Sequence, residues 1–82
     1  MFYVYLLLSL KDKGYYIGFS SNLKLRFEEH TKGKVQSTKD RRPLRLVYYE
    51  AYKIEKLARE RENQLKRFSS AYNALLKRLK LK

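Results

Sequence analysis

The apolar positions of the chain fall into short runs separated by polar, lysine-rich segments. An almost continuously apolar run at 2–8 predicts a strand that is buried on both faces or nearly so. An Asp-Lys-Gly turn signal at 12–14 follows, so the run at 15–20 predicts the returning strand of a hairpin. The run at 44–50, just after the only proline, predicts a third strand.

Apolar residues recur at helical spacing between the second and third strands. Leu23 and Phe27 lie four residues apart and would share the buried side of a helix over about 23–31. Ser21 or Asn22 is placed to cap its first turn, and a glycine shortly after its last turn is placed to end it.

A longer helix is predicted from about 53 to 68 and a final one over 71–82. Arg61 falls within the apolar side of the longer helix, either as a snorkelling side chain or because the assumed helical phase is wrong. The inner side of the longer helix is expected to carry Ile54, Leu57, Ala58, Leu65 and Phe68. The inner side of the final helix is expected to carry Leu75, Leu76 and Leu79.

The order β-β-α-β-α-α predicts an α+β fold, with a small, mainly antiparallel three-stranded sheet flanked by helices. At 82 residues the chain is expected to form a single domain over 1–82, near the lower size limit for a self-sufficient core. The absence of cysteine excludes a disulfide framework and a thiolate metal site, which suits a cytoplasmic protein.

The net charge of the chain indicates which class of molecule it binds. Twenty Lys and Arg residues against eight Asp and Glu give a formal net charge of +12. Eight tyrosines and four phenylalanines are interleaved with the basic residues, as is typical of phosphate contacts combined with base stacking. Nucleic acid is therefore the predicted partner. The opening apolar run is too short to span a bilayer, and an anionic membrane surface is a weaker alternative for the basic C-terminal stretch.

Strand alternation groups the hairpin side chains by face. One face is expected to hold Val4, Leu6, Tyr15 and Ile17, and the other Tyr3, Tyr5, Tyr16 and Gly18. Tyr5 and Tyr16 would then be diagonal neighbours within roughly 8 Å, with Gly18 leaving open space beside them. The structural alternative is that these tyrosines only cover the sheet against a helix.

Three further residues are candidates for chemistry. Arg26 and His30 lie four residues apart on one face of the first helix. The guanidinium of Arg26 could bind a phosphate through two hydrogen bonds, and the imidazole of His30 could accept or deliver a proton. Their structural alternative is a surface ion pair and a solvated histidine. Glu62 lies at the edge of the apolar stripe, able to reach an adjoining cleft, and its alternative is an i,i+4 pair with Lys66.

Five segments in this order resemble the GIY-YIG nuclease superfamily, and more narrowly its small single-domain bacterial branch, labelled uncharacterised or excinuclease-subunit-like. The resemblance covers about residues 2–68. The segments are "YVY" at 3–5, "YIG" at 16–18, "LKLRFEEH" at 23–30, "STKDRRPLRLVYYE" at 37–50 and "ARERENQLK" at 58–66.

The resemblance implies a metal-dependent endonuclease that hydrolyses DNA, rather than RNA, with Mg²⁺ or Mn²⁺. It assigns Tyr5 and Tyr16 to the hydroxyl pair that activates the nucleophile and Gly18 to the small residue beside them. Arg26 would hold the scissile phosphate, with His30 in the place of a histidine that many members carry. Two departures from the family pattern are Tyr3 in place of the first glycine and Asn73 as the only candidate for a late asparagine.

In the same resemblance Glu62 is the single metal-binding carboxylate. The residues expected to contact nucleic acid are Lys24, Lys34, Lys39, Arg41, Arg42 and Asn73. A chain this short leaves no room for a separate specificity module, so recognition of DNA structure is expected, in repair or recombination. We expect a monomer or weak homodimer that could join a larger repair complex. The alternative is a non-catalytic nucleic-acid-binding or interaction module.

Overall fold

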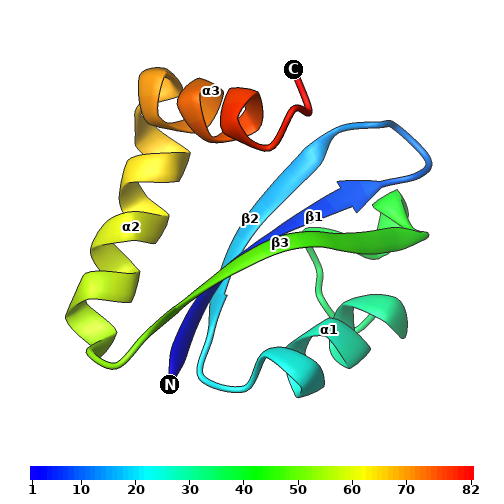
Figure 1. Ribbon diagram of the computed structural model, residues 1–82. Coiled ribbons are helices and arrows are strands. Elements are labelled where there is room, and N and C mark those ends of the chain that lie inside the picture. Colours follow the sequence, from blue (N-terminus) through cyan, green and yellow to red (C-terminus); the bar gives the residue numbers. More distant parts are fainter.

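The computed structural model describes residues 1–82 and contains one antiparallel sheet of three strands in the order β2-β1-β3 (Figure 1). The strands are β1 (Phe2–Ser9), β2 (Tyr15–Ser20) and β3 (Leu44–Tyr52). The predicted α+β fold and its order β-β-α-β-α-α are confirmed. Because β1 is the central strand and is covered on both faces, its sequence is an apolar run rather than an alternating one.

The helices are α1 (Leu23–Thr31), α2 (Glu55–Arg67) and α3 (Ser69–Arg78), with a 3₁₀ turn, η1 (Lys39–Arg41), before β3. Asn22 caps α1, since its side-chain oxygen accepts a hydrogen bond from the Leu25 backbone N–H at 3.1 Å. Beyond the other end of this helix, Gly33 adopts a φ of 77°, a left-handed conformation that favours glycine. The predicted bounds of this helix are therefore confirmed.

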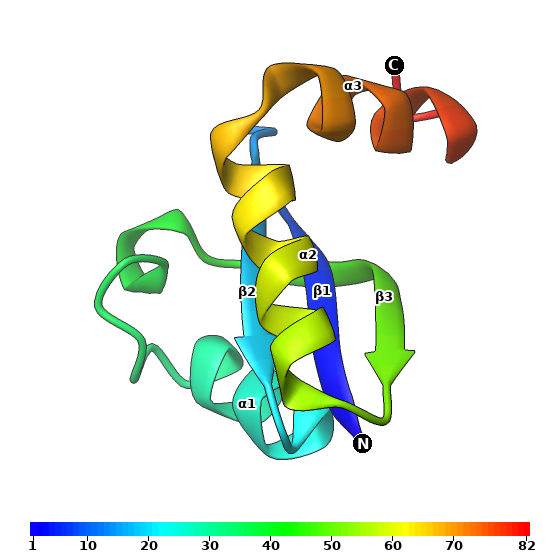
Figure 2. The ribbon, with the colours of Figure 1, turned by 90° about the vertical axis from the view of Figure 1, so that its left-hand side faces the viewer.

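The sheet separates two helical layers. Helices α2 and α3 cover one face, and α1 lies on the other (Figure 1 and Figure 2). The strand alternation expected from the sequence is correct, because the core on the α2 side is built from Val4, Leu6, Ile17, Ala58, Leu65, Leu75 and Leu76. Tyr5 points to the α1 side, where it contacts His30. No helix combines the length and apolar character needed to cross a bilayer.

The predicted inner side of α2 is wrong in part. Ala58 and Leu65 are buried, but Ile54, Leu57 and Phe68 are 57%, 46% and 58% exposed. Leu57 is turned about 100° around the helix from Ala58, so it lies at the edge of the buried stripe. Ile54 and Phe68 are also the residues that flank this helix rather than members of it.

Arg61 occupies its place in the apolar stripe because it meets a carboxylate. Its Nε lies 3.0 Å from Oε1 of Glu50 on β3, and both side chains are largely buried. Glu50 also accepts hydrogen bonds from the hydroxyls of Tyr48 and Tyr52. The phase of the helix was thus correct, and Arg61 forms a satisfied ion pair that ties α2 to β3.

Candidate active site

Tyr5 provides the centre of the site. It lies on the central strand, is 2% exposed, and is paired in the sheet with Gly18 on β2. A Cβ atom at position 18 would collide with Cζ and the hydroxyl oxygen of Tyr5, so the tyrosine side chain passes directly over the glycine. Because β2 is an edge strand, this path carries the Tyr5 hydroxyl toward that edge of the sheet.

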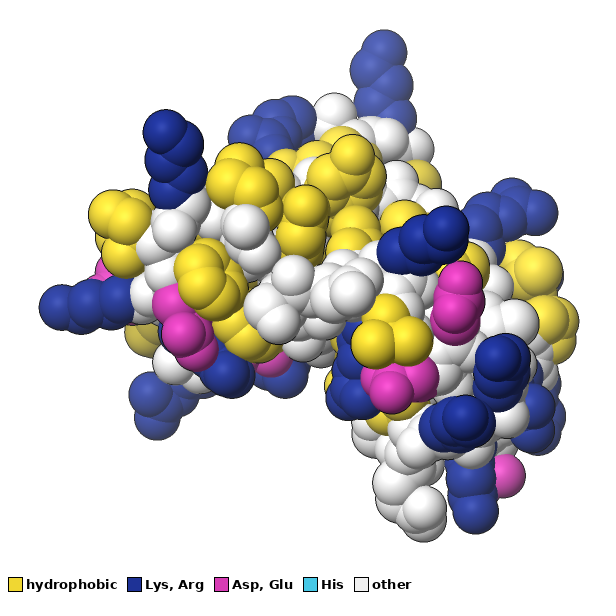
Figure 3. All heavy atoms as spheres, turned by 90° about the horizontal axis from the view of Figure 1, so that it is seen from below, with side chains coloured by type: hydrophobic (Ala, Val, Ile, Leu, Met, Phe, Trp, Pro, Cys, Tyr) yellow, Lys and Arg dark blue, Asp and Glu magenta, His cyan; other side chains and the backbone are white.

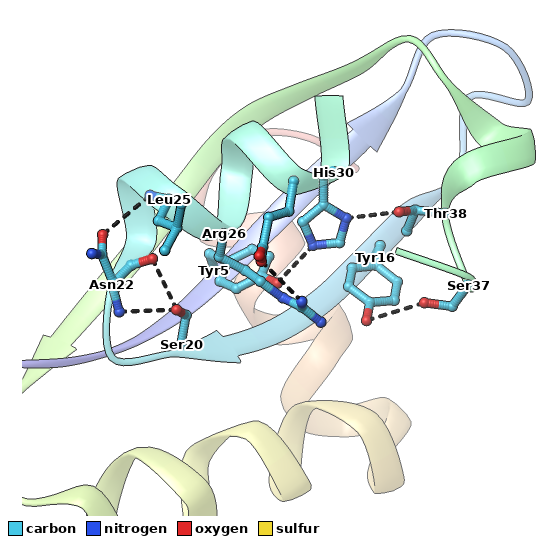
Figure 4. A network of polar contacts seen from close by, with 10 residues as sticks. Tyr5, Tyr16, Ser20, Asn22, Leu25, Arg26, His30, Ser37 and Thr38 are labelled. Atoms are coloured by element: carbon cyan, nitrogen blue, oxygen red, sulfur yellow. Dashed lines mark hydrogen bonds and ion pairs between the residues drawn. The ribbon is translucent and has the colours of Figure 1, made fainter. Parts of the chain in front are cut away.

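His30 holds the Tyr5 hydroxyl from α1. Its Nε2 lies 2.8 Å from the Tyr5 oxygen, and its Nδ1 lies 2.7 Å from Oγ1 of Thr38 (Figure 4). The rings of Tyr5 and Tyr16 meet the imidazole edge-to-face, with centroids 5.6 Å and 5.3 Å away. His30 and Thr38 are both fully buried, so the alternative of a solvated histidine is wrong.

Burial sets the protonation of this cluster. Burial, assisted by the positive charge of Arg26, lowers the pKa of His30 to about 4, so the imidazole is neutral at pH 7. Burial, together with the charges of Tyr16 and Glu62, raises the pKa of Tyr5 to about 12 against the opposing effect of Arg26. Tyr5 therefore keeps its proton at neutral pH unless a neighbour receives it.

Arg26 and Tyr16 border the cluster on its open side. The Arg26 guanidinium faces the Tyr5 hydroxyl, and its Nη1 lies 3.2 Å from Oε1 of Glu29. Its side chain is 38% exposed, so donors remain free for an anionic ligand. The Tyr16 hydroxyl accepts a long hydrogen bond of 3.4 Å from Ser37 (Figure 4). As expected from strand register, Tyr16 is the diagonal neighbour of Tyr5.

Glu62 belongs to the opposite helical layer. It lies on α2, and its negative charge makes a small contribution to the raised pKa of Tyr5. Its side chain is only 14% exposed, and Oε2 lies 2.8 Å from Nζ of Lys66. The i,i+4 pair therefore forms, while the second carboxylate oxygen has no protein partner.

The donor set fits a metal shared with a substrate better than a metal held by the protein alone. No group of three or more His, Asp or Glu side chains is arranged to hold an ion. One carboxylate with a free oxygen suits Mg²⁺ or Mn²⁺, since Mg²⁺ keeps several waters and takes further ligands from phosphate oxygens. Glu62 is thus the residue that would hold the ion.

The basic residues expected at a nucleic-acid surface have different surroundings. Lys24, Lys34 and Lys39 are exposed on α1 and the following connector. Arg42 packs its guanidinium against Gly33, whereas Arg41 is paired with Asp12 at 2.7 Å and so has part of its charge neutralised. Figure 3 shows Lys and Arg side chains projecting at several places along the outline of one face of the molecule.

Asn73 does not join the cluster. It lies on α3, in the layer opposite α1, and its side-chain oxygen accepts from Lys82. The other departure, Tyr3, packs edge-to-face on Tyr49 with centroids 6.0 Å apart. These two rings line a groove of about 580 Å³ between α1 and β3, and neither Tyr5 nor Arg26 lines it.

Thr38 and Ser37 are the site residues that sequence reasoning missed. Both lie in the polar connector after α1. A buried threonine and an exposed serine have the same appearance in such a segment, so no local signal separates them. Their hydrogen bonds to His30 and Tyr16 depend on the tertiary path of the connector.

The buried neutral state of His30 predicts an acid-sensitive fold. The folded-state pKa lies below the ordinary 6.5, so between pH 6.5 and about 4 the unfolded chain binds more protons and stability falls as pH falls. The His30 contribution to this loss should reach about 2 kcal/mol at pH 5. Urea unfolding at pH 7.5 and pH 5 would measure it. A His30→Gln variant with the same loss would contradict the assignment.

Comparison with known proteins adds an independent line of observation. The model of the family described as the GIY-YIG catalytic domain matches residues 1–74. A UPF0213 protein of Staphylococcus haemolyticus is 40% identical over 68 residues, covering 82% of each chain. A UPF0213 protein of Syntrophus aciditrophicus is 39% identical over 71 residues, covering 84% of this chain and 80% of the relative. No solved structure matches the chain.

Proposed function

This chain belongs to the family of GIY-YIG catalytic domains, as its five sequence segments suggested, and we propose that it is a metal-dependent endonuclease acting on DNA phosphodiester bonds. One observation carries the proposal beyond the family: the buried Tyr5 hydroxyl lies 2.8 Å from a neutral imidazole and faces an arginine with free donors. Tyr5 therefore has both a proton acceptor and a neighbour that can bind phosphate.

The proposed reaction uses each of these groups once. Arg26 binds the scissile phosphate through its exposed guanidinium. A phosphate anion bound to Arg26 offsets the positive charge that helps to lower the pKa of His30 and so makes the imidazole a better base. A water molecule then gives a proton to the Tyr5 oxygen as the hydroxyl proton of Tyr5 passes to Nε2 of His30. The resulting hydroxide attacks phosphorus, the bond from phosphorus to the leaving oxygen breaks, and that oxygen takes up a proton from solvent water. His30 then returns its proton to solvent through Tyr5, which restores the neutral imidazole.

His30 is fully buried, so in this mechanism it acts through Tyr5 and does not touch the substrate. A divalent ion, held by Glu62 and by phosphate oxygens, would supply Lewis-acid stabilisation of the charge that develops on the phosphate. Tyr16 packs its ring edge-to-face against His30, and in this mechanism its hydroxyl orients the attacking water.

The net charge of +12 is the guide to the substrate class. With the basic side chains spread over the surface, DNA structure or ends should be recognised rather than a long sequence. Lys24, Lys34, Lys39 and Arg42 would contact the phosphates nearest to α1. Repair or recombination in a cytoplasmic compartment is the setting that fits such a substrate, with the protein as a monomer or weak homodimer.

A cleavage assay tests the proposal. The purified protein would be incubated with single-stranded, duplex, flapped and branched DNA, each with Mg²⁺, Mn²⁺ or chelator. Cleavage of any of these that is lost with chelator is the expected result. Binding without cleavage under all conditions would instead identify a non-catalytic nucleic-acid-binding module.

Binding itself should depend strongly on salt. A protein that neutralises about four phosphates releases their counterions, so affinity should fall roughly 100-fold between 50 and 200 mM salt. Fluorescence anisotropy with a catalytically inactive variant measures this. Affinity that changes by less than about threefold would contradict the electrostatic basis of the interaction.

A further inference from the structure

Thr38 is held rigidly beside His30. Its backbone N–H donates to the carbonyl of Val35 at 3.1 Å, and its carbonyl accepts from the backbone N–H of Arg41 at 2.9 Å. The side chain is fully buried, and Oγ1 lies 2.7 Å from Nδ1 of His30. The connector after α1 thus delivers one hydroxyl group to the imidazole from the side opposite Tyr5.

The hydrogen bonds around Tyr5 determine which nitrogen of His30 carries the proton. Tyr5 is buried and protonated, so its O–H needs an acceptor. Arg26 has only donors, which leaves Nε2 of His30, at 2.8 Å, as the acceptor. A neutral imidazole that accepts at Nε2 carries its proton on Nδ1, and that N–H then donates to Thr38.

We infer that Thr38 is a positioning residue that fixes the Nδ1–H tautomer of His30 and so keeps Nε2 free to receive the proton of Tyr5. Its catalytic consequence rests on the proposed function. When the proton moves from Tyr5 to Nε2, both imidazole nitrogens become donors, and Thr38 still accepts from Nδ1. Without Thr38 the Nδ1–H group is buried without a partner, which favours the other tautomer and blocks Nε2.

The tautomer can be observed without any activity. In ¹⁵N NMR spectra of the full chain at pH 7, His30 should show a protonated Nδ1 and an unprotonated Nε2. Thr38→Ser, which keeps the hydroxyl, should preserve this pattern. Thr38→Val, which has nearly the same shape, should shift the ring toward Nε2–H. Thr31→Val is the matched control, because its hydroxyl bonds only the Phe27 carbonyl on the exposed side of α1.

Kinetics give the second readout. Thr38→Val should lower kcat by about 10- to 100-fold with little change in KM, and Thr38→Ser should restore most of it. A wild-type spectrum with the proton on Nε2 would overturn the inference even if Thr38→Val failed to fold. Equal rates for the valine and serine variants would also overturn it. If the wild-type protein cleaved no DNA, the nuclease proposal would be refuted. The ¹⁵N NMR spectrum would still decide, on its own, which nitrogen of His30 carries the proton.

Discussion

Replacing Glu62 by glutamine is expected to reduce cleavage by orders of magnitude while leaving DNA binding intact. Glutamine preserves the length and helix propensity of the side chain but removes the charge that a hard divalent cation requires. The protein has no group of three or more His, Asp or Glu side chains arranged to hold an ion, so no other cluster can take over the metal. Binding should persist or tighten slightly, since one negative charge leaves a surface that faces phosphates.

Glu55 provides the matched control for this experiment. Both glutamates lie on α2 and both form an i,i+4 pair, Glu55 with Arg59 and Glu62 with Lys66. If pairing were the only role of Glu62, the two glutamine variants would each lose a few tenths of a kcal/mol and cut DNA at the same rate. A folded Glu62→Gln protein that cuts at the wild-type rate would refute the metal assignment.

The readout should include metal binding as well as cleavage. With one protein carboxylate, Mn²⁺ should bind the free protein weakly and bind more tightly when a DNA substrate contributes phosphate oxygens. Titration of Mn²⁺ into a complex with a non-cleavable phosphorothioate DNA would show this gain for the wild type and for Glu55→Gln. The gain should be absent for Glu62→Gln.

The strands and α1 could be predicted because their signals are local. An uninterrupted apolar run marks the central strand, and an Asn at the N-cap with a glycine after the last turn marks α1. Strand alternation then placed Tyr5 and Tyr16 on one face, since register follows from the hairpin. These predictions needed no knowledge of which elements pack together.

The errors in α2 arose where tertiary contacts decide burial. Leu57 lies at the edge of the buried stripe and is 46% exposed, while the Arg61 side chain is largely covered because Glu50 is opposite it. Helical periodicity gives the direction of a side chain and not the extent of the surface that it meets. A charged residue within an apolar stripe therefore signals a partner on another element.

The sequence named the members of the candidate site but could not give their arrangement in space. The resemblance and the spacing named Tyr5, Arg26 and His30 together, yet nothing local distinguishes a surface histidine from one that is fully buried. Burial also determines the two protonation states. It lowers the pKa of His30, so the imidazole is neutral at pH 7, and it raises the pKa of Tyr5, so the hydroxyl keeps its proton and needs a hydrogen-bond acceptor. Thr38 could not be predicted as a site residue, because only the folded path of the connector brings it close to His30.

The two tyrosines should respond differently when each loses only its hydroxyl. Tyr5→Phe should reduce single-turnover cleavage by orders of magnitude, because it removes the group that passes the proton of water to His30. Its ring can still lie over Gly18, so the fold should survive. A cost of about 1–3 kcal/mol is nevertheless expected, since Nε2 of His30 is left buried without its partner.

Tyr16→Phe is the comparison that assigns the base. The Tyr16 hydroxyl has only a 3.4 Å contact with exposed Ser37, so its loss should leave stability within about 0.5 kcal/mol of the wild type. Cleavage should fall less than in Tyr5→Phe, because Tyr16 has no hydrogen bond to the imidazole and can orient water without relaying its proton. Urea unfolding and single-turnover rates for both variants would check this order. If Tyr16→Phe were the slower enzyme and Tyr5→Phe the nearly normal one, the proton of water would pass through Tyr16, and the buried Tyr5–His30 pair would be a packing feature of the sheet.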